Sequence, residues 1–394
     1  MSPRVHLVID NCFASKRWTA PAEWAAIVAD LGVSLVEASA DNECDPLYSD
    51  PGYLADWIAD CQAARQTTGV AVANLYSGHG TYATLGLAHS DVRNRDRMQH
   101  QWLERMIDSA AALGAGLGFY THAFNQAVLN DPAAYAAAED DLYTRLGEVA
   151  AYAAGKGIRA AGVEQMYTPH QVPWTIAGAG RLLKEVYARG HWPFYLSLDT
   201  GHQIGQKRFL RPTRQQMEHW ADERRAGRQW RGFWLGPPAA YDLLDEAAAE
   251  SDPARGKLLD DLETMLEQYD HLFAQPQDGD LYEWARQLGC YCPIVHLQQT
   301  DGQRSAHWPF TPEHNARGIV RAEKLLEALA ESYRQAHDPT LPPPCSDIYL
   351  TVEVFSSTLD VPVDIINRLE ASVDYWRTYM PTDGVTLDEL AAKP

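Results

Sequence analysis

Short apolar runs alternate with longer segments of helical periodicity along the whole chain. Eight runs are apolar on both faces, as in VAVAN and FYLSLD, which is typical of strands in a parallel sheet covered by helices. They span residues 5–10, 34–38, 70–74, 116–121, 158–164, 194–199, 294–297 and 348–354. Between them, segments such as PAEWAAIVADL and IVRAEKLLEALAESY carry apolar residues at helical spacing.

Glycines occur at the joints between these segments. Five of them follow a helical segment and precede a strand, and one more does nearly the same: Gly32, Gly69, Gly114, Gly157 and Gly289, with Gly190 as the sixth. The residue that ends a helix often needs a positive φ, which favours glycine. Eight strand–helix units predict an α/β fold, a closed (β/α)8 TIM barrel, with a doubly wound open sheet as the alternative.

One unit of the predicted barrel is much longer than the others. Asp199 and His296 are 97 residues apart, so we expect an insertion after the sixth strand, over residues 211–280, within a single barrel domain that spans 1–394. The insertion is rich in tryptophan and continues into an acidic stretch that reads as an amphipathic helix or helical hairpin. We expect it to act as a lid or as a contact between subunits.

Composition narrows the classes of partner. The 394 residues include 33 Lys and Arg against 53 Asp and Glu, a net charge of −20, which argues against a basic surface for nucleic acid. The N-terminal MSPRVHLVID has no signal-peptide core, and no run reaches the roughly 18 apolar residues of a membrane span. The six scattered cysteines suit free thiols. We therefore expect a cytoplasmic protein that binds neither nucleic acid nor membrane.

The last four predicted strands end in residues suited to metal chemistry: Glu164, Asp199, His296 and Glu353. Strand ends of this kind meet around the active site of a barrel, where a carboxylate is costly to bury unless it is paired or binds a metal. Three carboxylates and one imidazole suit a divalent ion, Mn²⁺ first, with Mg²⁺, Co²⁺ or Zn²⁺ as alternatives. Taken singly, Asp199 fits a helix cap equally well, and His296 a core histidine. Four at corresponding positions favour the metal.

The motifs around these residues resemble a known family. GVEQM, LDTGH, VHLQQTD and VEVF, taken in order, are similar to the xylose isomerase-like TIM barrel superfamily, and within it to sugar (phosphate) isomerases and ketose 3-epimerases. The resemblance covers most of residues 5–379 but not the insertion. It implies that Glu164, Asp199, His296 and Glu353 bind the metal, that Glu164 and Glu353 are also the catalytic acid/base pair, and that His202 contacts substrate hydroxyls.

This chemistry defines an expected function, a divalent-metal-dependent sugar or sugar-phosphate epimerase or isomerase. A carboxylate removes a proton next to a ketose carbonyl, and the metal stabilises the enediolate that forms. Glu164 and Glu353 are on the fifth and eighth strands, so they can approach from opposite sides, which favours epimerisation. HLQQTDG and HWPFT are similar to the branch that acts on short ketose phosphates such as erythrulose phosphate. We expect a homo-oligomer, a dimer or a tetramer.

Further residues are candidates for the sugar pocket. Glu37, His79, His122 and Gln165 lie at or near predicted strand ends and are expected to bind substrate. Lys207 and Arg304 follow the sixth and seventh strands, where a phosphate often binds in barrels, although solvated surface cations are the equal alternative. His307, in HWPFT, belongs either to a loop near the mouth or to a surface turn.

Three other functions compete with this one. A lyase or dehydratase on a cyclic polyol or keto-sugar would use the same barrel and metal, with one carboxylate expelling a β-hydroxyl. A zinc endonuclease of the same fold would need more histidines and a basic groove, against which the charge of −20 counts. A non-catalytic binding protein would not need both Glu164 and Glu353.

Overall fold

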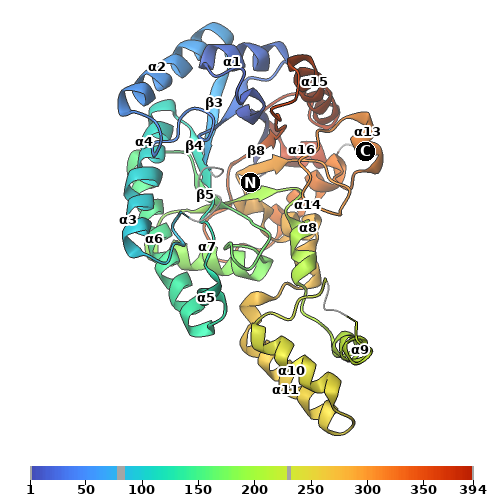
Figure 1. Ribbon diagram of the computed structural model, residues 1–394. Helices are drawn as coiled ribbons and strands as arrows, with labels where there is room; N and C mark the ends of the chain where they lie inside the picture. Colours follow the sequence, from blue (N-terminus) through green and yellow to red (C-terminus); the bar gives the residue numbers. More distant parts are fainter. Residues whose placement is uncertain (1, 78–84, 229–231, 393–394) are drawn as a thin grey trace.

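Eight parallel strands form a closed barrel in the computed structural model, which describes residues 2–77, 85–228 and 232–392 (Figure 1). Each strand pairs with the next, and β1 pairs with both β2 and β8, so the ring has no open edge. This confirms the predicted TIM barrel and excludes the open sheet. The strands are β1 (Arg4–Asp10), β2 (Leu35–Ser39), β3 (Ala71–Ser77), β4 (Gly116–Phe119), β5 (Ala161–Glu164), β6 (Tyr195–Asp199), β7 (Ile294–Leu297) and β8 (Asp347–Val352).

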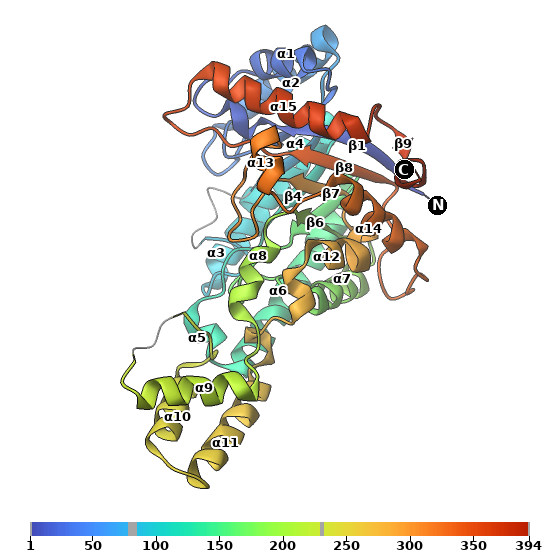
Figure 2. The ribbon, with the colours of Figure 1, turned by 90° about the vertical axis from the view of Figure 1, so that its right-hand side faces the viewer.

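Helices surround the barrel in the order that the periodicity predicts (Figures 1 and 2). The larger ones are α1 (Pro21–Asp30), α2 (Pro51–Thr68), α4 (Glu104–Leu113), α6 (Pro132–Lys156), α7 (Ile176–Gly190), α12 (Leu281–Leu288), α14 (Ala322–Arg334) and α15 (Pro362–Tyr379). Shorter elements fill the connections: α3 (Val92–Arg97), α5 (Gln126–Leu129), α8 (Gln203–Gln206), α13 (Pro312–Arg317), α16 (Leu387–Ala391) and a two-residue strand β9 (Val385–Thr386), antiparallel to β1.

Local sequence sets many helix ends. Asp50 and Asp131 accept hydrogen bonds from the first free N–H groups of α2 and α6, and a proline follows each of them. Four of the predicted joint glycines, at 32, 69, 114 and 157, have positive φ as expected.

Two joint glycines serve packing rather than a left-handed turn. Gly289 has a φ of −56°, and a Cβ there would lie 2.7 Å from Leu329 Cδ2. At the end of α7 the left-handed residue is His191, with a φ of 58°, whereas a Cβ on Gly190 would lie 2.7 Å from the carbonyl oxygen of Gly147 in α6. Positive φ was therefore the wrong expectation at Gly289 and Gly190, where close packing excludes a side chain.

The N-terminal end of the barrel is closed by side chains. Val8, Ala73 and Tyr349 form a small buried cluster there. Arg159 donates to the Tyr349 hydroxyl, and also to the backbone carbonyl groups of Ala73 (3.3 Å) and Gly114 (2.8 Å). The interior is packed from this end, so polar side chains at the other end form the floor of any site.

The long connection between β6 and β7 forms a helical arm that projects from the barrel (Figure 2). It consists of α9 (Arg214–Arg225), α10 (Pro238–Ala249) and α11 (Ala254–Gln268), after which α12 returns to the barrel wall. Leu244, Leu259, Leu262 and Leu266 are buried among these helices, which gives the arm an apolar core of its own. In the described parts of the chain, no helix combines the length and apolar composition that crossing a bilayer requires.

Candidate active site

Four acidic or imidazole side chains meet at the C-terminal end of the barrel. Strand register places Asp199 of β6 directly opposite His296 of β7, and Glu164 ends β5. Ligand atoms of Asp199, His296 and Glu353 all lie within 4.8 Å of one another, as do those of Glu164, Asp199 and His202. Asp199 belongs to both groups, so the residues predicted at four strand ends form one continuous cluster.

His296 lies between two carboxylates. Its Nε2 is 2.7 Å from Glu37 Oε1, and its Nδ1 is 3.0 Å from Glu164 Oε1. Glu37 ends up behind the imidazole, fully buried and outside the lining of the cavity described below. A carboxylate in this position orients a histidine and fixes which nitrogen is left for the centre of the site.

Asp199 is held by backbone and side-chain donors. Its Oδ1 accepts the N–H groups of Gly201 (2.6 Å) and His202 (3.0 Å). The amide nitrogen of Gln298 lies 2.8 and 2.9 Å from its two oxygens. A Cβ at position 201 would lie 2.5 Å from Gln298 Cδ, so the glycine of LDTGH gives this amide its access. The N-cap of α8 is His202, so Asp199 closes the turn before this helix and does not cap the helix itself, while its carboxylate also belongs to both groups of potential ligands.

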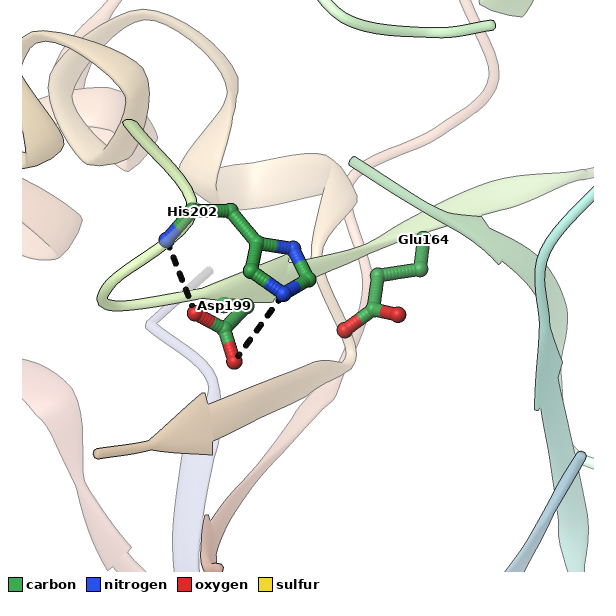
Figure 3. Close-up of side chains that lie close together, drawn as sticks. All are labelled: Glu164, Asp199 and His202. Carbon is green, nitrogen blue, oxygen red and sulfur yellow. Dashed lines mark hydrogen bonds and ion pairs between the residues drawn. The ribbon is translucent and has the colours of Figure 1, made fainter. Parts of the chain in front are cut away.

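Figure 3 shows how His202 faces the same centre. Its Nδ1 is 2.9 Å from the backbone oxygen of Gln165, a contact in which the ring must donate, and this directs Nε2 to within 3.8 Å of Asp199 Oδ2. Gln165 itself does not reach the cavity: it is buried, and its side-chain oxygen accepts from Gln203 (2.9 Å). The structure thus places His202 among the potential ligands and Gln165 behind it.

Glu353 pairs with a histidine that sequence reasoning left unassigned. His307 Nδ1 lies 2.8 Å from Glu353 Oε2. His307 has a left-handed φ of 45°, and its backbone N–H donates to Gln298 Oε1 at 2.7 Å. The only signal in the sequence was the position of His307 after the seventh strand, because a loop conformation decided which way its ring points.

Glu164 has a different partner, the hydroxyl of Tyr76, which donates to it. The Tyr76 ring also packs edge-on against His296, with ring centroids 4.6 Å apart. On the neighbouring strand, a Cβ at Gly118 would lie 2.8 Å from Tyr76 Cδ2. The lack of a side chain at position 118 therefore makes room for a tyrosine inside the barrel.

These groups open into a cavity of about 370 Å³. We call it the inner cavity; it is lined by Tyr76, Tyr120, Glu164, Met166, Tyr167, His202, His307, Glu353 and Phe355. Aromatic rings and Met166 form its apolar surfaces, and the two glutamates and two histidines form its polar ones. This combination suits a small polyol, because apolar faces of a sugar pack on rings while its hydroxyls need fixed partners.

The remaining predicted residues lie elsewhere. His122 is fully buried with a φ of 69°, packed against Trp102 and Tyr120, and burial lowers its pKa to about 3. His79 lies outside the described residues. Lys207 and Arg304 line a second, separate cavity of about 650 Å³ beside the inner one.

Histidine charges keep the two glutamates ionised. Burial opposes ionisation of Glu164, but His202 and His296 outweigh it, so the pKa of Glu164 lies below its usual value. Burial likewise opposes ionisation of Glu353, yet His307 above all lowers its pKa to about 2. Conversely, Glu353 raises the pKa of His307 to about 9 against the effect of burial. Both carboxylates are thus poised to accept protons at neutral pH.

The cluster fits a divalent cation. Carboxylate oxygens of Glu164, Asp199 and Glu353, with imidazole nitrogen from His296 or His202, form a donor set suited to Mn²⁺, Mg²⁺, Co²⁺ or Zn²⁺. The positive imidazoles of His296 and His307 offset the negative charges of Glu164 and Glu353, as a bound cation would also do. Among the residues described, Glu37 has one buried oxygen without a hydrogen-bond partner and the other on His296, as expected of a carboxylate behind a ligand.

Residues 25–231 match the family described as xylose isomerase-like TIM barrel. A 58-residue segment is 43% identical to D-erythrulose 1-phosphate 3-epimerase of Brucella abortus (strain 2308), and this match spans 15% of the chain and 19% of that relative. A protein of Rhodospirillum rubrum ATCC 11170 that is assigned as a xylose isomerase has a similar structure: TM-score 0.67, 20% identity, with 95% of this chain and 99% of that one covered. L-Ribulose 3-epimerase gives a TM-score of 0.51 at 15% identity, covering 96% and 93%. The structural likenesses establish the shared barrel.

Proposed function

The chain belongs to the xylose isomerase-like TIM barrel family, and from this premise we propose that it is a divalent-metal-dependent carbohydrate epimerase that moves a proton on the carbon next to a ketose carbonyl. One observation carries the proposal. Two ionised, buried glutamates, one at the end of β5 and one directly after β8, line the same sugar-sized cavity, and both belong to a cluster of potential metal ligands. Two such carboxylates can remove a proton from one face of a carbon and return a proton to the opposite face.

The metal would be held by Glu164, Asp199, His296 and Glu353, with His202 close enough to Asp199 and Glu164 to join or replace one of them. When bound, it would supply Lewis-acid polarisation of the carbonyl oxygen and a neighbouring hydroxyl, which makes the adjacent C–H acidic. Glu37 would hold the His296 ring in place from behind.

Each glutamate has its own proton relay. Removing a proton needs an ionised carboxylate, whereas returning one needs a protonated group. An epimerase therefore needs one group in each protonation state, on opposite sides of the substrate carbon. His307 contacts Glu353 through a ring N–H, and Tyr76 contacts Glu164 through its hydroxyl. Since these partners differ, Glu353 with His307 is the better proton donor pair, and Glu164, beside a tyrosine whose pKa burial and Glu164 raise, is the better base.

The first substrate to test is D-erythrulose 1-phosphate, because the short match to the 3-epimerase of that sugar supports this chemistry at C3. Tetruloses to hexuloses, with and without phosphate, complete the series. The metal-loaded protein is incubated with each ketose in D₂O, and deuterium at the carbon beside the carbonyl is followed by NMR. An aldose product would instead indicate an isomerase, and loss of water a lyase.

Glu164→Gln and Glu353→Gln are the decisive variants. Each should abolish epimerisation, lowering the rate by about a thousandfold or more, while one epimer still exchanges deuterium in each variant, and a different epimer in the two. Metal content is measured in parallel, because both residues are also proposed ligands. The matched control is Glu43→Gln, a buried glutamate outside the cavity, bonded to the indoles of Trp24 and Trp57, which should leave turnover unchanged. Full epimerisation by both cavity variants would refute the proposal.

A further inference from the structure

A second cavity, of about 650 Å³, lies beside the inner cavity and shares Tyr167 with it. We call it the cationic cavity. Segments that follow three consecutive strands line it: residues 167–168 after β5, residues 204–209 after β6, which belong to α8 and the 3-10 turn behind it, and residues 302–305 after β7. Because Tyr167 lines both spaces, and Ser305 of one lining is two residues from His307 of the other, the two cavities are adjacent.

Three cations converge on this second space. Lys207, Arg208 and Arg304 all line it, and all three are exposed. Within the described chain, none of them has a carboxylate oxygen within 4.0 Å, in contrast to arginines such as Arg189, Arg214 and Arg286, each of which pairs with two or more carboxylates. In a protein with 53 acidic residues against 33 basic ones, three unpaired cations around one cavity form an uncompensated positive site.

The loop that carries Arg304 is tied directly to the candidate metal ligands. Ser305 Oγ lies 3.0 Å from the side-chain nitrogen of Gln298, the same nitrogen that contacts both oxygens of Asp199. Thr300 Oγ1 donates to the backbone carbonyl of Arg304 and accepts the N–H of Gly302 at 3.1 Å, and Gly302 has the left-handed φ of 80° that this turn needs. The position of Arg304 is thus set relative to Asp199 by a short chain of hydrogen bonds.

The opposite wall is held equally close to the site. A Cβ on Gly205 would lie 2.6 Å from Tyr167 Cβ, so only glycine lets α8, which leads into Lys207 and Arg208, pack onto the loop after β5. Tyr167 in turn packs edge-on against His202, with ring centroids 4.8 Å apart. Contacts with residues at or next to the inner cavity therefore fix the positions of both walls.

We propose that the cationic cavity binds the phosphoryl group of a phosphorylated ketose whose carbonyl end lies between Glu164 and Glu353; this assignment rests on the function proposed above. Guanidinium groups pair with phosphate oxygens through two parallel hydrogen bonds, and an ammonium adds a point charge, so Arg208, Arg304 and Lys207 match a phosphate dianion. Binding energy from this non-reacting end would add equally to the affinity for the bound substrate and for its transition state, which lowers KM and leaves kcat unchanged.

The test compares a phosphorylated and an unphosphorylated ketose of the same length, D-erythrulose 1-phosphate and D-erythrulose, in Lys207→Ala and Arg304→Ala. Each substitution should raise KM for the phosphate ester about tenfold, and the double variant about a hundredfold, with kcat within about twofold, since one charge-assisted contact is lost each time. KM for free erythrulose should stay unchanged. Arg317→Ala is the control, an exposed arginine in α13 that pairs with Glu313. Equal changes for both sugars, or none for either, would overturn the assignment.

Inorganic phosphate separates this proposal from the catalytic one. Binding is measured by titration calorimetry on the metal-loaded protein, and it should be lost in the Lys207→Ala/Arg304→Ala double variant but kept in Glu353→Gln. This result is independent of turnover, so it stands even if no ketose is epimerised. Phosphate should also inhibit competitively against the phosphate ester; non-competitive inhibition or activation would assign the cavity to a free effector anion and contradict the substrate assignment. Unchanged binding in the double variant would exclude the site.

Discussion

The inner and cationic cavities are neighbours, yet their charges are arranged in opposite ways. In the inner cavity, Glu164 and Glu353 are buried and each has a hydrogen-bond partner. In the cationic cavity, Lys207 and Arg304 are exposed and have no carboxylate nearby among the residues described. Residues in or shortly after strands build most of the first, together with the loop residue His307. The second is lined by α8, the 3-10 turn that follows it and two loops.

The contrast follows from the cost of desolvation. A buried charge is tolerated only with its partners in place, so a change in the inner cavity leaves another charge uncompensated. An exposed cation is already solvated, so its removal affects what binds rather than whether the chain folds. The two cavities should therefore respond differently to substitution. Changes in the inner cavity should have large effects on both stability and binding, whereas changes in the cationic cavity should affect binding with little effect on stability.

The largest effect is expected for His296→Ala. It leaves the buried Glu37 and Glu164 facing each other without a cation, which should lower the free energy of unfolding by about 3–5 kcal/mol and weaken Mn²⁺ binding by more than about a hundredfold. Urea unfolding measures the change in the free energy of unfolding, and calorimetric titration with Mn²⁺ measures the change in metal affinity. His100→Ala is the matched control: this exposed histidine pairs with Glu104 at 2.7 Å, and its loss should cost less than about 0.5 kcal/mol. Equal costs for both variants would remove the contrast between buried and exposed charge.

Glu43 is a buried carboxylate of another kind, because no cation pairs with it among the residues that the structure describes. Its oxygen accepts from Trp24 (3.1 Å) and Trp57 (2.6 Å), and burial raises its pKa to about 7. The folded protein therefore holds a proton that the unfolded chain releases near pH 4.5, so stability is lost as pH rises from about 4.5 to 7. Relative to the parent, Glu43→Gln should gain about 2–3 kcal/mol in unfolding free energy between pH 5 and 8. If the difference in unfolding free energy between Glu43→Gln and the parent does not change with pH, Glu43 is ionised throughout this range.

Glu37→Gln tests the support behind the proposed ligands. Glutamine cannot carry the charge that holds the Nε2–H of His296, so Mn²⁺ affinity should fall about 10- to 100-fold. At saturating metal, turnover should largely recover, which distinguishes a supporting residue from a catalytic one. Glu43→Gln, on the same stretch of chain but away from His296, should keep the parental affinity. Loss of turnover in Glu37→Gln that excess Mn²⁺ does not restore would contradict this role.

The smallest effect on stability is expected for a substitution in the cationic cavity. Arg304→Ala should change the unfolding free energy by less than about 0.5 kcal/mol, because the side chain is exposed and makes no ion pair with the described residues. Urea unfolding beside His296→Ala gives the direct comparison. A cost above about 2 kcal/mol would mean that Arg304 stabilises its loop, and effects of Arg304→Ala on KM would then have a structural cause.

Much of the barrel was predictable because its signals are local. Apolar runs located all eight strands to within three residues at each end, and glycine marked four helix ends with positive φ. The cluster of Glu164, Asp199, His296 and Glu353 was predictable for a related reason: in a closed parallel barrel all strand ends of one kind meet on one face, so position along the chain implies proximity.

Other features depended on contacts between segments far apart. His307 reaches Glu353 through a left-handed loop residue, and Tyr76 reaches Glu164 across the barrel because Gly118 leaves the space. Glu37 lies within β2 and Gln165 directly follows β5, but their partners His296 and His202 place them behind the cavity. No periodicity encodes these choices.

The barrel, the face on which polar strand ends gather and the helical character of the long connection can all be derived from the sequence alone, because each depends on hydrophobic period, chain direction or helix ends. Contacts formed on folding settle which side chains near the strand ends enter the cavity, which lie behind them, and that three cations from two separate segments line one space. Side-chain direction at a strand end depends on the volume and charge of neighbours hundreds of residues away, and those meet only once the ring has closed.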